Sequence, residues 1–587
     1  MWGGDARCPV YPSSAWSLQS DRIALESLTQ SFSNRSHESK ALTLPRTNFI
    51  DDHIFGKMAT DGVEPAPLAT DAEILRRLSL DLTGRIPASE QVVSFLKNPD
   101  PDKRSKLIES LIASEAFVDY WTLYFGDKFQ VTARWYNLIG IPGRTLFHRF
   151  LKDFVARDRS YRDFATELIT ASGDSYQNGA LNFMARSYNV SEPMQDAWDT
   201  LTDRLTTVFL GVQTQCVSCH DGERHLEDIN LYLASRKRAE FWRQSAFLSR
   251  TKWVQVAVDA RLFQSRLLIS DRTTGSYTGL VDPGNPGVRP LRANGPFDAQ
   301  YFFSGESPRS DEWRSELARM ITADRQFARA TVNYIWAHFF RNGIVDPPDG
   351  WDLMRIDPQN PPPKPWALQP THPELLDALA DEFIRSNYSI RHVIRLIALS
   401  NAYQLSSRYP YEWRPEYERY FARHLPRRLM AEEIYDAITT ATATEREMHI
   451  EGIDKPVYYA SQLPDPVEPR YDSRILNILT NFGRGDWVQK PRKNGSGVVQ
   501  VLLMMNDPDL NGRTFADRNY STRVSRIMLS APNAEDAVQA LFLSTLGRYA
   551  AAEELATSLA ARGSDYAQWL SDIQWALMNK TEFVFNN

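Results

Sequence analysis

Amphipathic segments with their own helix start and stop signals recur along this 587-residue chain, and they constrain its fold more than any other feature. In "TDAEILRRLSLDLTG", Thr70 and Glu73 have the spacing of a capping box, apolar residues follow at helical intervals, and Gly84 is a typical stop. The stretch "DPDKRSKLIESLIASEAFVDYWTLYFGDKF" predicts two more helices, the second capped by Ser114. These repeated patterns predict a mostly α, multi-helical protein.

The helical pattern continues over residues 145–170, over "DEWRSELARMITADRQFARATVNYIWAHFF" and in the final third of the chain. In "THPELLDALADEFIRS", Thr371 and Glu374 predict a second capping box. Repeated prolines in "DPPDGWDLMRIDPQNPPPKPWALQP" exclude a helix there. The stretch "DPDLNG", residues 507–512, resembles the opening of a calcium loop. It has Arg518 where a bidentate Glu is needed, so we interpret it as a helix-capping turn.

Composition divides the chain into four segments. Residues 1–44 are polar with little periodicity and predict an N-terminal arm. Residues 45–265 predict a helical domain, and residues 266–310 concentrate Gly and Pro among short β-favouring pieces. Residues 311–587 predict a second helical domain. We therefore expect two helical domains that are joined by an irregular linker with minor β structure.

Several classes of function lack their usual sequence features. The net charge is −6 and no long run of Lys or Arg occurs, which argues against a nucleic-acid partner. The longest nearly apolar run, residues 498–505, is far shorter than the ~20 residues of a membrane span. The chain contains no G-x-S-x-G, H-E-x-x-H, P-loop or G-x-G-x-x-G motif. Any catalysis would therefore have to depend on the motif described next.

Residues 211–226 read "GVQTQCVSCHDGERHL" and contain a C-x-x-C-H motif. With three Cys and ten His in the chain, this pattern would rarely arise by chance, and it is typical of covalent haem c attachment. On one helical turn, Cys216 and Cys219 can each add to a haem vinyl group, and His220 can bind the iron. An apolar helical stripe precedes the motif and predicts that it is delivered into a core: Leu201, Leu205, Val208, Phe209 and Val212.

Two other uses of the cysteine pair stay open. A zinc site could use Cys216, Cys219 and His225 with a fourth ligand elsewhere, although neighbouring residues such as Cys219 and His220 point about 100° apart on a helix. A C-x-x-C redox disulfide normally opens a helix in a βαβ unit and has no use for the histidine.

The sixth ligand of a haem iron is not fixed by the sequence. The candidates are His225, Met184, Met194, His338 and His372. Because His225 lies only five residues after His220, a contact to the bound histidine or to a haem propionate is easier for it than axial ligation. His225 is therefore a candidate for either role.

Several strings in the first half resemble the planctomycete-type cytochrome-C-like domain, a domain of unknown function, over residues 45–255. They are "NFIDDHIFGKM", "LRRLSLDLTGRIP", "YWTLYFGDKF", "FLGVQTQCVSCH" and "GERHLEDINLY". The second half, with "FARATVNYIWAHFFRNGIVDPPDGWD", "RRLMAEEIYDAI" and "WALMNKTEFVFN", resembles the planctomycete-specific partner domain that usually follows it.

The resemblance implies haem thioether attachment by Cys216 and Cys219 and iron ligation by His220. Many relatives have a second histidine as C-H-x-H, whereas Asp221 and Gly222 intervene here. It also implies an extracytoplasmic, periplasmic or cell-surface protein. No secretory signal is visible in "MWGGDARCPVYPSS", so we expect that the sequence begins after processing or at a late start codon.

These observations favour an exported mono-haem c-type cytochrome that transfers electrons to an unknown redox or structural protein partner. A haem enzyme with an open distal side is one alternative. A structural subunit of a larger extracytoplasmic assembly is another, because the chain is much longer than one haem requires.

Overall fold

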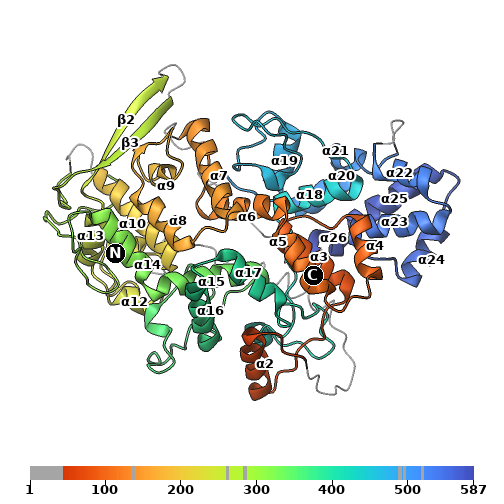
Figure 1. The fold of residues 1–587 in the computed structure, drawn as a ribbon, viewed down its shortest axis with the longest axis horizontal. Helices are drawn as coiled ribbons and strands as arrows, with labels where there is room; N and C mark the ends of the chain where they lie inside the picture. The colour runs from red at the N-terminus through yellow and green to blue at the C-terminus, as the bar shows by residue number, and fades with distance from the viewer. Residues whose placement is uncertain are drawn as a thin grey trace, which may run out of the picture. The chain divides into compact units, whose positions relative to one another are not determined.

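The computed structural model describes residues 44–133, 139–259, 264–281, 287–486, 492, 498–516 and 521–587. Within these residues it contains 25 α-helices and five β-strands, so the prediction of a mostly α, multi-helical protein is confirmed (Figure 1). The expected N-terminal arm lies almost wholly outside the described residues. None of the described helices combines the length and the apolar composition that crossing a bilayer requires.

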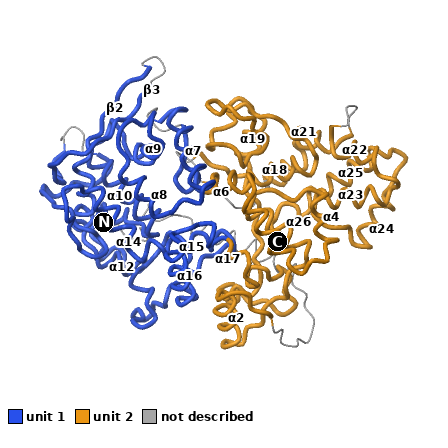
Figure 2. Tube along the Cα trace, in the orientation of Figure 1, with its two compact units in different colours: residues 1–16, 125–394 blue, residues 17–124, 395–587 orange. Residues whose placement is uncertain are grey.

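The described residues form two compact units, each assembled from separate parts of the chain (Figure 2). Unit 1 contains Phe125–Ile394, and unit 2 contains Arg395–Asn587 together with the described residues up to Tyr124. The unit boundaries fall within helices α6 (Glu115–Lys128) and α17 (Ile390–Leu399). These units combine separate segments of the chain, whereas the domains expected from the sequence are continuous stretches. The boundaries of those domains stay a prediction.

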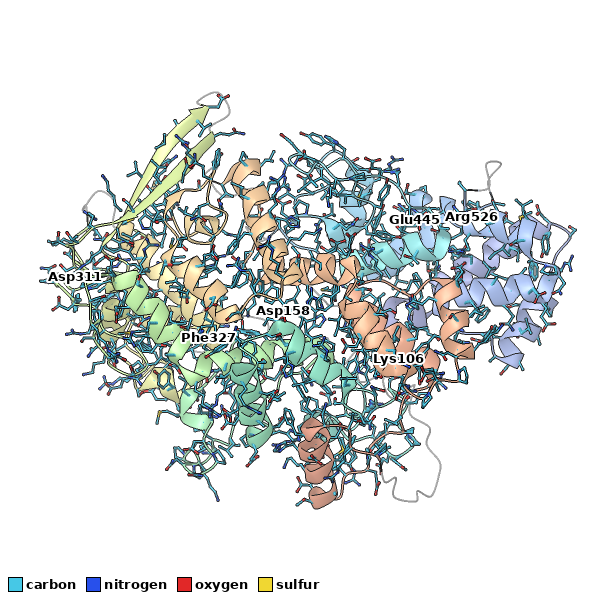
Figure 3. All side chains as sticks on the ribbon, in the orientation of Figure 1. Lys106, Asp158, Asp311, Phe327, Glu445 and Arg526 are labelled. Atoms are coloured by element: carbon cyan, nitrogen blue, oxygen red, sulfur yellow. The ribbon has the colours of Figure 1, made fainter. Side chains whose placement is uncertain are left out.

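Unit 1 packs its helices around aromatic side chains. Phe327, labelled in Figure 3, is fully buried. Its ring lies 5.4 Å from that of Tyr161 and 6.0 Å from that of Phe209. Helix α14 packs on α8, and α15 packs on α10 and α16. The helices of the unit are α7 (Gly140–Ala156), α8 (Tyr161–Thr170), α9 (Leu181–Ala185), α10 (Met194–Leu210), α11 (Gln215–Cys219), α12 (Leu231–Ala234), α13 (Arg238–Ala246), α14 (Trp313–Ala323), α15 (Arg325–Phe340), α16 (Pro373–Arg385) and the 3-10 turn η1 (Leu353–Arg355).

A β-hairpin in unit 1 is the main element that we did not expect. Strands β2 (Thr251–Asp259) and β3 (Gln264–Asp271) pair antiparallel, and β1 (Gly173–Asp174) adds a third strand in the order β1-β3-β2. The alternating, valine-rich run "KWVQVAV" in β2 fits a strand better than a helix. The hairpin therefore begins inside the segment expected to be helical.

The regular secondary structure of unit 2 is almost entirely helical. Its core includes Ile434 and Ile438 of α18 (Ala431–Thr442), Leu541 of α23 and Leu570 of α25. Its other elements are α2 (Phe49–Asp61), α3 (Asp71–Thr83), α4 (Ser89–Lys97), α5 (Lys103–Ile112), α19 (Ser473–Asn481), α20 (Val498–Asn506), α21 (Pro508–Gly512), α22 (Arg523–Ser530), α23 (Ala534–Leu546), α24 (Ala552–Ala560), α25 (Tyr566–Met578), α26 (Thr581–Val584), the 3-10 turns η2 (Pro415–Tyr420) and η3 (Ala460–Gln462), and the paired strands β4 (Arg427–Arg428) and β5 (Phe585–Asn586).

The predicted helix caps have mixed outcomes. Thr70 and Glu73 form the expected capping box at α3, and the Asp507 side chain caps α21 as predicted for "DPDLNG". The prediction for Thr371 and Glu374 is wrong, because α16 begins at Pro373 with His372 at its N-cap position. The Thr371 backbone instead donates to the Ile344 carbonyl, and a proline at the first helical position needs no acceptor for an N–H.

Candidate functional site

Helix α10 leads the chain to the C-x-x-C-H motif and is held in the core of unit 1. Its expected apolar stripe is buried, with Leu201, Leu205, Val208 and Phe209 all largely inaccessible. The helix ends at Gly211, which has a left-handed backbone with φ of 72°. A Cβ at this position would lie 2.3 Å from the Trp351 ring, so only glycine fits both the conformation and the packing.

The two cysteines lie on the single turn of α11. Cys216 is buried and Cys219 is partly exposed. His220 follows with an extended backbone, and its N–H donates to the Cys216 carbonyl over 3.2 Å. The motif is therefore a helical turn whose second cysteine and histidine reach the surface of the unit.

The His220 ring is fixed in orientation by a neighbouring carbonyl. Its Nδ1 lies 2.7 Å from the Asp221 carbonyl oxygen. A carbonyl oxygen can only accept, so Nδ1 carries the proton and Nε2 keeps its lone pair. A backbone carbonyl on Nδ1 is the usual support for a histidine that binds metal through Nε2. The donor set of the motif thus fits haem iron.

His225 lies beside His220. The two ring centres are 4.5 Å apart with an interplanar angle of 48°, and His225 is exposed. Two imidazoles on opposite sides of one metal ion, each about 2 Å from it, would have ring centres about 6 Å apart. In this arrangement His225 flanks His220, and its role at a haem stays a prediction.

The four other candidates for a sixth ligand lie on other elements of unit 1 than the motif turn. The sulfur of Met184 lies 3.6 Å from a guanidinium nitrogen of Arg314. Met194 begins α10, His338 lies edge-on to Phe339 in α15, and Nδ1 of His372 lies 3.1 Å from the Thr371 hydroxyl. Across the described ranges, no three His, Cys, Asp or Glu side chains form a group that could hold a metal ion.

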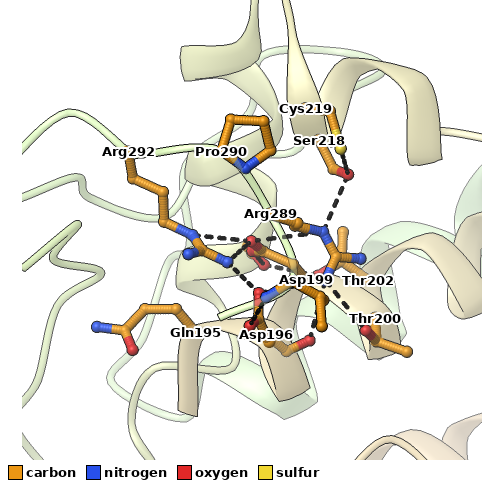
Figure 4. A network of polar contacts seen from close by, with 12 residues as sticks. Gln195, Asp196, Asp199, Thr200, Thr202, Ser218, Cys219, Arg289, Pro290 and Arg292 are labelled. Carbon is orange, nitrogen blue, oxygen red and sulfur yellow. Dashed lines mark hydrogen bonds and ion pairs between the residues drawn. The ribbon is translucent and has the colours of Figure 1, made fainter. Parts of the chain in front are cut away.

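A buried network of charges lies next to the motif and reaches it through Ser218 (Figure 4). Asp196 and Asp199 of α10 are fully buried, and the Arg292 guanidinium lies 2.5 Å from Asp196 and 3.0 Å from Asp199. Asp199 also accepts from the hydroxyls of Tyr277 and Ser245. Burial raises the pKa of Asp199, while the charges of Arg289 and Arg292 act in the opposite direction.

Two arginines bind Ser218, one of the two residues between the cysteines, and one of them, Arg289, belongs to this network. Arg289 donates through Nε to the Ser218 hydroxyl over 3.0 Å and through another nitrogen to Thr200. Arg238 donates to the Ser218 carbonyl over 2.9 Å. The Ser218 oxygen lies 3.7 Å from the sulfur of Cys219. The guanidinium groups of Arg289 and Arg238 therefore hold the motif turn in place through Ser218.

These charged residues were not among the candidates from the sequence. Asp196 and Asp199 are three apart in α10, which places both on one face of the helix. Their partners in "GVRPLR" lie about 90 positions away in the irregular linker. The paired aspartates could have been noticed, whereas their partners could not be identified without the fold.

Fold and motif together define a mostly helical protein that presents one C-x-x-C-H turn at the surface of a compact unit. Residues 49–252 match the family model PSCyt2, a protein of unknown function (DUF1549), and residues 313–561 match PSD1, a protein of unknown function (DUF1553). The chain belongs to the proteins that carry the planctomycete cytochrome-C-like domain followed by its C-terminal partner domain. No curated protein and no solved structure matches it.

Proposed function

We propose that this protein is an extracytoplasmic mono-haem c-type cytochrome that transfers electrons. Cys216 and Cys219 would hold the haem through thioether bonds, and Nε2 of His220 would bind the iron. The observation that carries the proposal is the C-x-x-C-H turn in which His220 Nδ1 faces the Asp221 carbonyl. Haem c bound there would supply a one-electron iron couple.

The partly exposed position of Cys219 and His220 supports electron transfer over a buried catalytic function. A haem edge at the surface can exchange electrons with a partner without the partner entering the protein. The physiological partner would be another extracytoplasmic redox protein or a subunit of the same assembly.

Intact mass and a pyridine haemochrome spectrum of the protein, produced with a c-type maturation system, test the proposal. We expect a mass increase of one haem that survives denaturation and a spectrum of thioether-linked haem. The double variant C216S/C219S should lose both, whereas C8S, which replaces the one cysteine outside the motif, should keep both. An unmodified wild-type mass would overturn the proposal and leave zinc or a disulfide to be tested.

The spin state distinguishes electron transfer from catalysis. A low-spin ferric spectrum that does not change with cyanide is expected for an electron-transfer site with both axial positions filled. A high-spin spectrum that shifts with cyanide would overturn electron transfer in favour of a haem enzyme.

A further inference from the structure

The short helix α12, which follows the motif, is capped by a residue from a distant part of the chain. The backbone N–H groups of Leu231 and Tyr232 donate to the two carboxylate oxygens of Asp352 over 2.8 and 3.0 Å. The third N–H of the helix, from Leu233, donates to the side chain of Asn230. Helix N–H groups without acceptors are costly, and charged acceptors are the strongest.

Trp351 holds both flanks of the motif at once. Its backbone carbonyl accepts from the Asn230 side chain over 2.9 Å, ten residues after His220. Its backbone N–H donates to the Gly211 carbonyl over 3.1 Å, five residues before Cys216, and its ring covers Gly211. Trp351 and Asp352 are completely or almost completely buried. We call these two residues the clip.

Helix α12 in turn fixes the chain just after His220. The N–H of Gly222 donates to the Arg236 carbonyl over 2.9 Å. A Cβ at Gly222 would lie 1.8 Å from the Leu233 carbonyl oxygen, so the backbone of Gly222 packs directly on α12. A displacement of α12 must therefore reach Gly222, two residues from His220.

The clip lies inside the PSD1 match, whereas the motif and α12 lie inside the PSCyt2 match. Both belong to unit 1. We propose that the first part of the PSD1 region completes the C-x-x-C-H site of the PSCyt2 region, with Trp351 and Asp352 as positioning residues. An effect of this positioning on iron ligation by His220 rests on the proposed function, whereas the positioning of residues 222–234 does not.

Hydrogen exchange of the full-length protein tests the positioning, with or without haem. D352N removes the charge and one acceptor, so exchange of the Leu231 and Tyr232 amides should rise by about tenfold or more. D357N is the matched control, because Asp357 is exposed in the same segment and accepts from Gln359 and Asn360. Unchanged protection at Leu231, Tyr232 and Gly222 in D352N would overturn the proposal.

The haem-loaded protein provides a second readout. D352N should shift the reduction potential or the ligand-sensitive absorption bands at unchanged haem content, and D357N should not. If D352N does not fold, N230S replaces it, since it keeps a capping oxygen but removes the donor to Trp351. Altered exchange with unaltered haem spectra would show that the clip positions residues 222–234 but does not affect the iron. A protein without covalent haem would instead reject the proposed function, and the exchange result would still stand.

Discussion

At the scale of single residues, the hydrogen bond between His220 and the Asp221 carbonyl selects one tautomer and one ring orientation. The ring of His225 lies next to it without sharing this support. The two histidines of "CHDGERH" therefore have unequal geometry, although the sequence presents both as candidates.

Replacing each histidine separately should show this inequality. H220A removes the proposed iron ligand, so we expect loss of the low-spin spectrum in any haem-loaded protein. H225A should keep the low-spin spectrum and shift only the reduction potential. Absorption spectra and redox titration of both variants provide the measurement, and a low-spin spectrum in H220A would contradict the assignment.

Asp203 should make stability depend on pH. Burial raises its pKa from 3.8 to about 6, although the Thr214 hydroxyl donates to it over 3.2 Å. Between pH 4 and 6 the folded state then binds more protons than the unfolded state, so this residue lowers stability as pH rises through that window. D203N keeps an acceptor oxygen but cannot ionise.

We therefore expect D203N to gain stability relative to wild type on going from pH 4 to pH 7, by on the order of 1 kcal/mol. Urea unfolding followed by tryptophan fluorescence at several pH values measures it. A stability difference that does not vary with pH would contradict the raised pKa.

At the scale of elements, the linker segment at residues 287–292 binds to α10 mainly through charges. Arg292 lies within 3.0 Å of both buried aspartates, whereas Arg289 reaches the same carboxylates only at 3.5 and 4.0 Å. Residues 287–292, which their composition predicts to be irregular, are thus bound to α10 by ion pairs.

The two arginines should differ in their effect on stability. R292A leaves two buried carboxylates poorly compensated, which we expect to cost about 3–5 kcal/mol. R289A should cost less, because Arg292 still compensates both aspartates. R309A, which removes an exposed pair with Glu306, should change stability by less than about 0.5 kcal/mol. Denaturant unfolding ranks the three variants, and equal losses for R292A and R309A would contradict the network.

At the scale of the whole molecule, each family match contributes to both units. Arg314 of the second match donates to the Ala171 carbonyl over 2.6 Å within unit 1. Tyr120 of the first match donates to Glu433 over 2.6 Å within unit 2. The two sequence families are therefore interdependent in structure.

A cut between the two matches tests this interdependence. A protease site inserted between Arg309 and Ser310, both exposed, would separate them in the covalent chain. After cleavage of the folded protein, we expect both fragments to elute together from a size-exclusion column and to separate only in denaturant. Separation under native conditions would show that the families fold independently.

The sequence predicted correctly those features that depend on residues close together in the chain. The capping box at Thr70, the cap at Asp507 and the buried stripe of α10 all follow from residues within a few turns of one another. The cap of α12 by Asp352 joins residues 121 positions apart, and nothing near Leu231 indicates it. The capping box predicted for Thr371 was wrong because the Thr371 backbone instead bonds to Ile344, far from it in sequence.

The assembly of unit 2 from both ends of the chain also affects biosynthesis. Arg76 of α3 donates to the Phe583 carbonyl, and the two residues are 507 positions apart. During translation α3 leaves the ribosome long before its partners exist, so its buried arginines and apolar face lack these contacts until residues near 583 have been made. We therefore expect unit 2 to complete its fold late, and the apolar face of α3 to need protection from aggregation until then.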